Sequence, residues 1–142
     1  MTVSVERTVE FDVQPSAIWA FLVDPANRAN AISVVADWER AGEATIWHIE
    51  LPIPLLDPTV PVRTRDVEVV ENRRVRFVGH SDVFDVRGVH ELEPVNGGTR
   101  LHNRFVLEGS FPGVERFFEA NLDGELENLL DALEHYLEAN RT

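Results

Sequence analysis

Two polar side chains, His90 and Asn103, occupy positions where the sequence allows chemistry. Asn96-Gly97 is a strong signal for a two-residue hairpin turn, because both turn positions take positive φ. That turn places His90 opposite Asn103, on strand faces that are otherwise apolar. The pair could hydrogen-bond a carbonyl or hydroxyl group, and His90 is our one catalytic candidate, as an acid-base group. The alternative is that the two side chains satisfy each other or backbone groups.

Arginines form the second set of candidates. Arg7 shares a strand face with apolar neighbours, and Arg63 and Arg65 have the same parity as Val67 and Val69. This parity predicts that Arg63 and Arg65 point inward near the rim of a cavity. A guanidinium there could bind a carboxylate or phosphate through two parallel hydrogen bonds. The alternative is that the aliphatic stems run along the sheet edge and place the charges in water.

Other catalytic and metal-binding patterns are missing from the sequence. The chain has no cysteine, which excludes disulfides, thiolate metal sites and cysteine nucleophiles. The serines show no nucleophile-elbow pattern. His48, His80 and His102 fall on outward-facing positions and lack metal-ligand spacing. We therefore predict no metal site and no cofactor.

The charge balance restricts the possible partners. There are 25 acidic residues and 13 basic ones, every basic residue is arginine, and the net charge is −12. Such a charge disfavours nucleic acids and anionic membrane surfaces. Two explanations stay open, adaptation to high salt, which we favour, and a genome that prefers arginine codons. No apolar run approaches the length of about 20 residues that a membrane span needs. We predict a cytoplasmic protein without membrane insertion.

Hydrophobic periodicity predicts the elements that position these residues. Residues 3–13 alternate as a half-buried strand, and Gln14-Pro15-Ser16 and Asp24-Pro25 each begin a short helix. Six further strands follow as hairpins, and an amphipathic helix of about 28 residues begins after Gly113. The predicted fold is α+β, with the order β-α-α-β-β-β-β-β-β-α. We expect a single domain over residues 1–142, with a curved seven-stranded antiparallel sheet around the last helix.

Turn positions also predict how the strands pair. A turn at Gly42-Glu43 places Trp38 opposite Trp47 and Ala36 opposite Ile49. A three-residue connection after the next strand places Val69 opposite Val75, and Val67 opposite Phe77. The segment from Pro52 to Pro61 carries four prolines, so we expect it to be a stiff loop or sheet edge.

A cavity is expected where the bent sheet and the straight helix diverge. We predict a volume of roughly 300 Å³ or more, with three connections at its rim. The predicted ligand-binding residues are Trp47, Phe77, Phe84, His90, Asn103, Phe105, Phe117, Asn121 and Leu122. The predicted rim residues are Leu55, Leu56, Arg63, Arg65 and Phe111.

Two glycines face the predicted cavity. Gly88 and Gly124 should mark a close approach of sheet, helix or ligand, so a leucine at either position should reduce ligand uptake without unfolding the protein. The alternative for the whole region is that its apolar side chains simply close the core.

Three stretches resemble a known superfamily. They are VEFDVQPSAIWAFLVDPAN from Val9 to Asn27, the strand start GGTRL from Gly97 to Leu101, and the long last helix. Together they resemble the START-like, SRPBCC or polyketide-cyclase superfamily, whose fold is the helix-grip. Within it, the chain is most similar to the proteins that resemble the G-type accessory component of carbon monoxide dehydrogenase. That superfamily includes lipid, sterol and quinone carriers, aromatic cyclases and chaperone activators, and it has no shared catalytic set.

Three functions follow as hypotheses. The first is binding or carriage of a small hydrophobic molecule such as a lipid, quinone or polyketide. The second is a cyclase or dehydratase that uses His90 in the same cavity. The third is an accessory protein that docks on a protein partner or forms a homodimer. A docking protein should have a filled interior and an exposed apolar patch.

Overall fold

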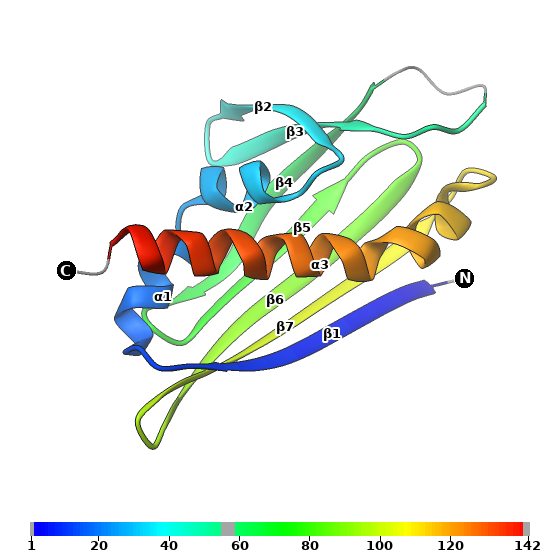
Figure 1. The fold of residues 1–142 in the computed structure, drawn as a ribbon. Helices are drawn as coiled ribbons and strands as arrows, with labels where there is room; N and C mark the ends of the chain where they lie inside the picture. Colours follow the sequence, from blue (N-terminus) through cyan, green and yellow to red (C-terminus); the bar gives the residue numbers. More distant parts are fainter. Residues whose placement is uncertain (1, 55–58, 141–142) are drawn as a thin grey trace.

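A single antiparallel sheet curves around one long helix in the computed structural model, which describes residues 2–54 and 59–140 (Figure 1). The strands pair in the order β1-β7-β6-β5-β4-β3-β2, so β1 and β2 form the two edges. The chain passes from one edge to the other through two short helices. The helices are α1 (Pro15–Leu22), α2 (Pro25–Ala31) and α3 (Val114–Ala139). The strands are β1 (Thr2–Phe11), β2 (Val35–Ala41), β3 (Ala44–Glu50), β4 (Thr59–Val70), β5 (Arg74–His80), β6 (Phe84–Val95) and β7 (Gly98–Gly109).

Local sequence signals explain where the helices begin. Pro15 and Pro25 occupy the first turns of α1 and α2, where a missing backbone N–H does no harm. The Asp24 side chain caps α2 by accepting a hydrogen bond of 3.0 Å from the Ala26 backbone N–H. Gly113 precedes α3 with a φ of 92°, a left-handed conformation that glycine adopts without strain. The predicted element order and the helix-grip arrangement are therefore confirmed.

Two hairpin registers agree with the turn predictions. Trp38 pairs with Trp47, and His90 pairs with Asn103. Pro61 differs from its predicted place in a loop, because β4 begins at Thr59 and Pro61 pairs with His48.

Two bulges change the predicted pairing elsewhere. In β2 an irregularity between Val35 and Asp37 places Val35, rather than Ala36, opposite Ile49. In β4 a shift between Asp66 and Glu68 places Asp66, rather than Val67, opposite Phe77. An inserted residue reverses the parity of everything beyond it.

The β4 bulge overturns the prediction for two arginines. Before the bulge, Val62 and Thr64 are buried, whereas Arg63 and Arg65 are exposed on the outer side of the sheet. The parity of the later valines therefore does not extend back to these arginines. Val67 itself is 47 % exposed. Neither Arg63 nor Arg65 points into the interior.

The core lies between the concave side of the sheet and α3. The inner face of α3 buries an apolar stripe against the sheet and α1, which is typical of an amphipathic helix. On the outer side, Arg7 of β1 forms ion pairs with Asp123 and Glu127 of α3, the first at 2.9 Å. Among the described residues, no helix combines the length and apolar character that crossing a membrane requires. The buried stripe comprises Val114, Phe118, Leu122, Leu126, Leu129, Leu130 and Leu133.

Candidate functional site

His90 and Asn103 meet inside the protein, as their strand register predicts. The His90 side chain is 1 % exposed and Asn103 is fully buried, and His90 Nδ1 lies 2.7 Å from Asn103 Oδ1. Because an amide oxygen only accepts hydrogen bonds, Nδ1 carries the proton and Nε2 keeps a free lone pair. Burial lowers the pKa of His90 to about 4, and the positive charge of Arg28 lowers it further against the opposing effect of Asn103. His90 is therefore uncharged at neutral pH.

The Phe77 ring lies at the centre of this region. His90 stacks on it with ring centroids 5.9 Å apart, and Trp47 and Phe105 approach it at 6.1 and 5.9 Å. Gly88 lies directly opposite Phe77 in the sheet, and a Cβ added there would lie 2.2 Å from Phe77 Cε1. Glycine is thus needed at position 88 so that the ring can lie across the strand.

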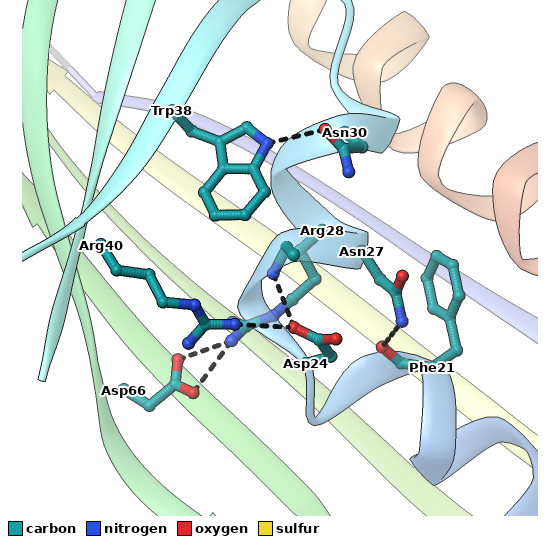
Figure 2. Close-up of polar contacts among 9 residues, drawn as sticks. Phe21, Asp24, Asn27, Arg28, Asn30, Trp38, Arg40 and Asp66 are labelled. Atoms are coloured by element: carbon teal, nitrogen blue, oxygen red, sulfur yellow. Dashed lines mark hydrogen bonds and ion pairs between the residues drawn. The ribbon is translucent and has the colours of Figure 1, made fainter.

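Helix α2 contributes a buried cation to the same region. The Arg28 guanidinium carbon lies 5.5 Å from the centroid of the Phe77 ring, a cation-π distance. Its Nη2 donates to both carboxylate oxygens of Asp66 on β4, each at 2.9 Å (Figure 2). Neither Arg28 nor Asp66 was predicted from the sequence. The available signal was Asp66, a carboxylate inside the strand of the rim arginines.

Further polar contacts fasten α2 to the sheet. Trp38 Nε1 on β2 donates to Asn30 Oδ1 at 2.7 Å, and Arg40 on β2 pairs with the capping Asp24 at 3.2 Å (Figure 2). Together with the Arg28 ion pair, these contacts hold α2 against β2 and β4. The position of Arg28 over the Phe77 ring is therefore fixed from two sides.

Four buried nitrogens around Phe77 have no hydrogen-bond partner within the described part of the chain. They are Arg28 Nε, Trp47 Nε1, His90 Nε2 and Asn103 Nδ2. Three of them carry N–H donors, and His90 Nε2 is an acceptor in the neutral imidazole. We call these four nitrogens and the Phe77 ring the Phe77 cluster. Buried polar atoms are nearly always paired in folded proteins, so such a group points to a binding site.

The cavity between the sheet and α3 is much smaller than predicted. It measures about 40 Å³. A second space of about 20 Å³ lies beside Arg28 and Thr64, and Trp47 and Phe77 border both spaces. The prediction of roughly 300 Å³ was wrong because the aromatic rings and the leucines of α3 occupy the space where sheet and helix diverge. The larger space is lined by Ile32, Val34, Trp47, Ile49, Phe77, Phe84, Val86, Phe105, Leu107, Phe118, Leu122 and Glu125.

Glu125 is a buried acid on α3 that was expected on the solvent face. Its carboxylate accepts hydrogen bonds from the Ser33 backbone and hydroxyl, the Val34 backbone and the Asn128 amide, at 2.7–3.0 Å. These bonds join α3 to the segment between α2 and β2. Its spacing from Leu122 and Leu129 was the signal, because residues three and four apart share a helix face.

The predicted lining residues fall into three groups. Trp47, Phe77, Phe84, Phe105 and Leu122 border the 40 Å³ cavity, whereas His90 and Asn103 lie in the adjoining Phe77 cluster. Asn121 is exposed and its amide donates to the Phe117 backbone carbonyl at 2.7 Å, so the expected inward position was wrong.

Gly124 also differs from its expected position. It is exposed, and a Cβ added there meets no described atom within 4 Å. The close approach of sheet or ligand that we expected at this glycine is therefore wrong.

The rim prediction is correct in its arrangement. Ser110 N–H donates to the Val83 carbonyl at 2.9 Å, and a Cβ on Gly113 would lie 3.5 Å from Ile53, so the three connections meet. Leu55 and Leu56, two predicted rim residues, lie outside the described residues. The connections form an apolar groove of about 560 Å³. We call it the rim groove, and its lining is Pro52, Ile53, Pro54, Phe111, Pro112, Gly113, Arg116 and Phe117.

No cluster of three or more histidines, acids or cysteines with metal-binding geometry occurs among residues 2–54 and 59–140. The groups available for ligand binding are thus the aromatic rings of the interior and the nitrogens of the Phe77 cluster.

A curved antiparallel sheet that holds a long C-terminal helix, with an aromatic interior between them, defines a helix-grip protein. The family described as "Polyketide cyclase / dehydrase and lipid transport" matches residues 2–138, and the chain belongs to this family. No curated protein matches the sequence significantly.

Solved structures of similar shape support the fold assignment. A conserved protein from Geobacillus kaustophilus shares 12 % identity at a TM-score of 0.75, with 100 % of this chain and 98 % of that one covered. A START superfamily protein from Mycobacterium smegmatis shares 17 % identity at 0.73, covering 97 % and 99 %. A Thermus thermophilus protein shares 19 % identity at 0.69, with both chains fully covered. At these identities the likeness concerns the fold alone.

Proposed function

We propose that the protein binds and carries a small hydrophobic molecule, such as a lipid, quinone or polyketide, between the sheet and α3. The observation that supports this most is the apolar cavity beneath α3, which is bordered by five aromatic rings. Family membership points the same way, because the family is described by lipid transport and polyketide cyclisation. Aromatic and aliphatic linings with a few polar groups are typical of small-molecule sites.

The cavity volume determines how a ligand would enter. A space of about 40 Å³ holds only two or three water molecules. A ligand must therefore widen it, either by moving the Phe77 ring or by lifting α3 from the sheet. Carriage by such a protein requires a rearranged bound state.

The properties of His90 favour carriage over catalysis. A general base works best when its pKa lies near the operating pH. With a pKa of about 4, the His90 imidazole is a weak base at neutral pH. The cyclase or dehydratase alternative would need a bound substrate that raises this pKa by several units.

A cavity-filling substitution tests the proposal. Leu122→Phe places a larger side chain at the cavity wall, so the affinity for an apolar fluorescent probe should fall tenfold or more. Gly124→Ala, on the exposed face of the same helix, should leave probe binding unchanged. Equal probe affinity in wild type and Leu122→Phe, or no probe binding by the wild type, would refute interior binding.

The rim groove supports a second candidate, docking on a protein partner or a second copy. Its lining is mostly apolar, and the interior beside it is nearly filled, which is the combination expected of a docking protein. If two copies pair through the groove, sedimentation velocity should show a concentration-dependent dimer that Phe111→Asp abolishes. A monomer at every concentration would remove the homodimer from consideration.

Finer assignments rest on the sequence. The similarity to the G-type accessory component of carbon monoxide dehydrogenase, the cytoplasmic location and the adaptation to high salt stay predictions.

A further inference from the structure

We propose that the Phe77 cluster binds the carbonyl-type oxygen of the carried molecule, as found in a ketone or a carboxylate. This inference rests on the proposed function and adds the chemical class of the ligand's polar end. The cluster provides three N–H donors, from Arg28, Trp47 and Asn103, and one acceptor, His90 Nε2. A carbonyl oxygen accepts hydrogen bonds and donates none, so it matches a site with an excess of donors.

Burial makes this match selective. Every side chain of the cluster is at least nine-tenths buried, with Trp47 the most exposed at 6 % and Asn103 fully buried. An apolar ligand would leave the three donors unsatisfied, whereas a carbonyl oxygen would pair with them. Sites built from buried polar groups reject analogues that lack the matching group.

The charges of the cluster exclude cationic ligands. The Arg28 cation is already paired with Asp66, and His90 is neutral. A ligand ammonium group would therefore find only His90 Nε2 as an acceptor, next to a guanidinium. A neutral ketone enters without leaving an unpaired charge, and a carboxylate would be held by Arg28 and a proton on His90.

The arrangement of the two small spaces gives the ligand its orientation. Trp47 and Phe77 border both the 40 Å³ cavity beneath α3 and the 20 Å³ space beside Arg28. Movement of the Phe77 ring would join them into one site. The carbonyl end would then lie at the Phe77 cluster, and the apolar end would lie against Phe84 and Leu122.

Three naphthalenes that differ in one substituent test the inference. Wild-type protein is titrated calorimetrically with 2-acetylnaphthalene, 2-naphthoate and 2-ethylnaphthalene. We expect at least one of the two carbonyl compounds to bind about tenfold more tightly than 2-ethylnaphthalene, which corresponds to the net gain of one or two hydrogen bonds. A tighter ketone identifies a neutral polar end, and a tighter naphthoate identifies a carboxylate.

A double substitution assigns the preference to the cluster. Arg28→Met with Asp66→Asn removes one donor without leaving a lone buried charge, so the preference should fall to about threefold or less while the affinity for 2-ethylnaphthalene is kept. Asn30→Ala is the matched control, because it removes another contact between α2 and the sheet outside the cluster. It should leave the preference intact.

A third variant keeps the test decisive if the double variant does not fold. Phe77→Ala opens a ring-sized space beside the four nitrogens, and acetophenone should bind it about tenfold more tightly than ethylbenzene. Equal affinities within each series would overturn the inference and leave interior binding standing, with ordered water satisfying the nitrogens. Absence of any binding in both series would refute interior binding as well.

Discussion

His90 shows how a single buried side chain couples charge to stability. Its pKa is about 4 in the folded protein, against 6.5 for the exposed imidazole, so the unfolded chain binds more protons between these values. The folded state is therefore fully stable with respect to His90 above pH 6.5, and it loses stability as the pH falls from 6.5 to 4. At about 1.4 kcal/mol per pH unit, the loss amounts to about 3 kcal/mol.

Urea unfolding at several pH values measures this effect. Other groups titrate in the same range, so wild type is compared with His90→Gln, which cannot take up a proton. We expect the wild type to lose about 3 kcal/mol more than the variant between pH 7 and pH 4. Parallel pH profiles for the two proteins would contradict a buried, neutral His90.

The predictability of the site differs from residue to residue. His90 and Asn103 were predictable because Asn96-Gly97 determines the register of their hairpin. Arg28 was not, since its burial depends on Asp66, 38 residues away in the chain. The aromatic residues were placed on the correct face, but their ring positions, and hence the cavity volume, depend on packing that a sequence pattern does not specify.

Two glycines of different elements should respond oppositely to the same substitution. Gly124→Ala adds a methyl group on the exposed side of α3, so it should stabilise the protein by about 1 kcal/mol through helix propensity. Thermal and urea unfolding measure the change. A destabilised Gly124→Ala variant would mean that this position is packed after all.

Gly88→Ala should instead destabilise the protein. Its methyl group would overlap the Phe77 ring, which is packed among Trp47, His90 and Phe105 and has little freedom to move. Overpacking of this kind costs about 1–3 kcal/mol. Gly88→Leu should accordingly lower stability rather than merely block uptake, which corrects our expectation from the sequence. An unchanged unfolding midpoint for Gly88→Ala would show that Phe77 moves easily.

The bulges explain why the sheet was predicted in outline but not in every register. An extra residue leaves the apolar alternation intact on each side of it, so a sequence pattern cannot reveal its position. In β4 the bulge after Asp66 exchanges the inward and outward faces. That exchange is why the rim arginines lie outside and a carboxylate lies inside, next to Arg28.

At the scale of the whole molecule, the charge predicts a response to salt. A net charge of −12 without lysine produces self-repulsion, which salt screens. If the acidic surface reflects adaptation to high salt, the melting temperature should keep rising up to molar KCl, beyond the range of simple Debye screening. A melting temperature that levels off at a few hundred millimolar would favour the arginine-codon explanation.

The central claim is that the helix-grip interior carries a small hydrophobic molecule, and native mass spectrometry tests it most directly. The protein is purified from its source organism under mild conditions and compared with Leu122→Phe prepared in the same way. We predict that the wild type carries a small organic molecule, released on collisional activation, and that the variant carries much less. The bare mass of the chain in both preparations, together with no uptake of added apolar probes, would contradict the claim.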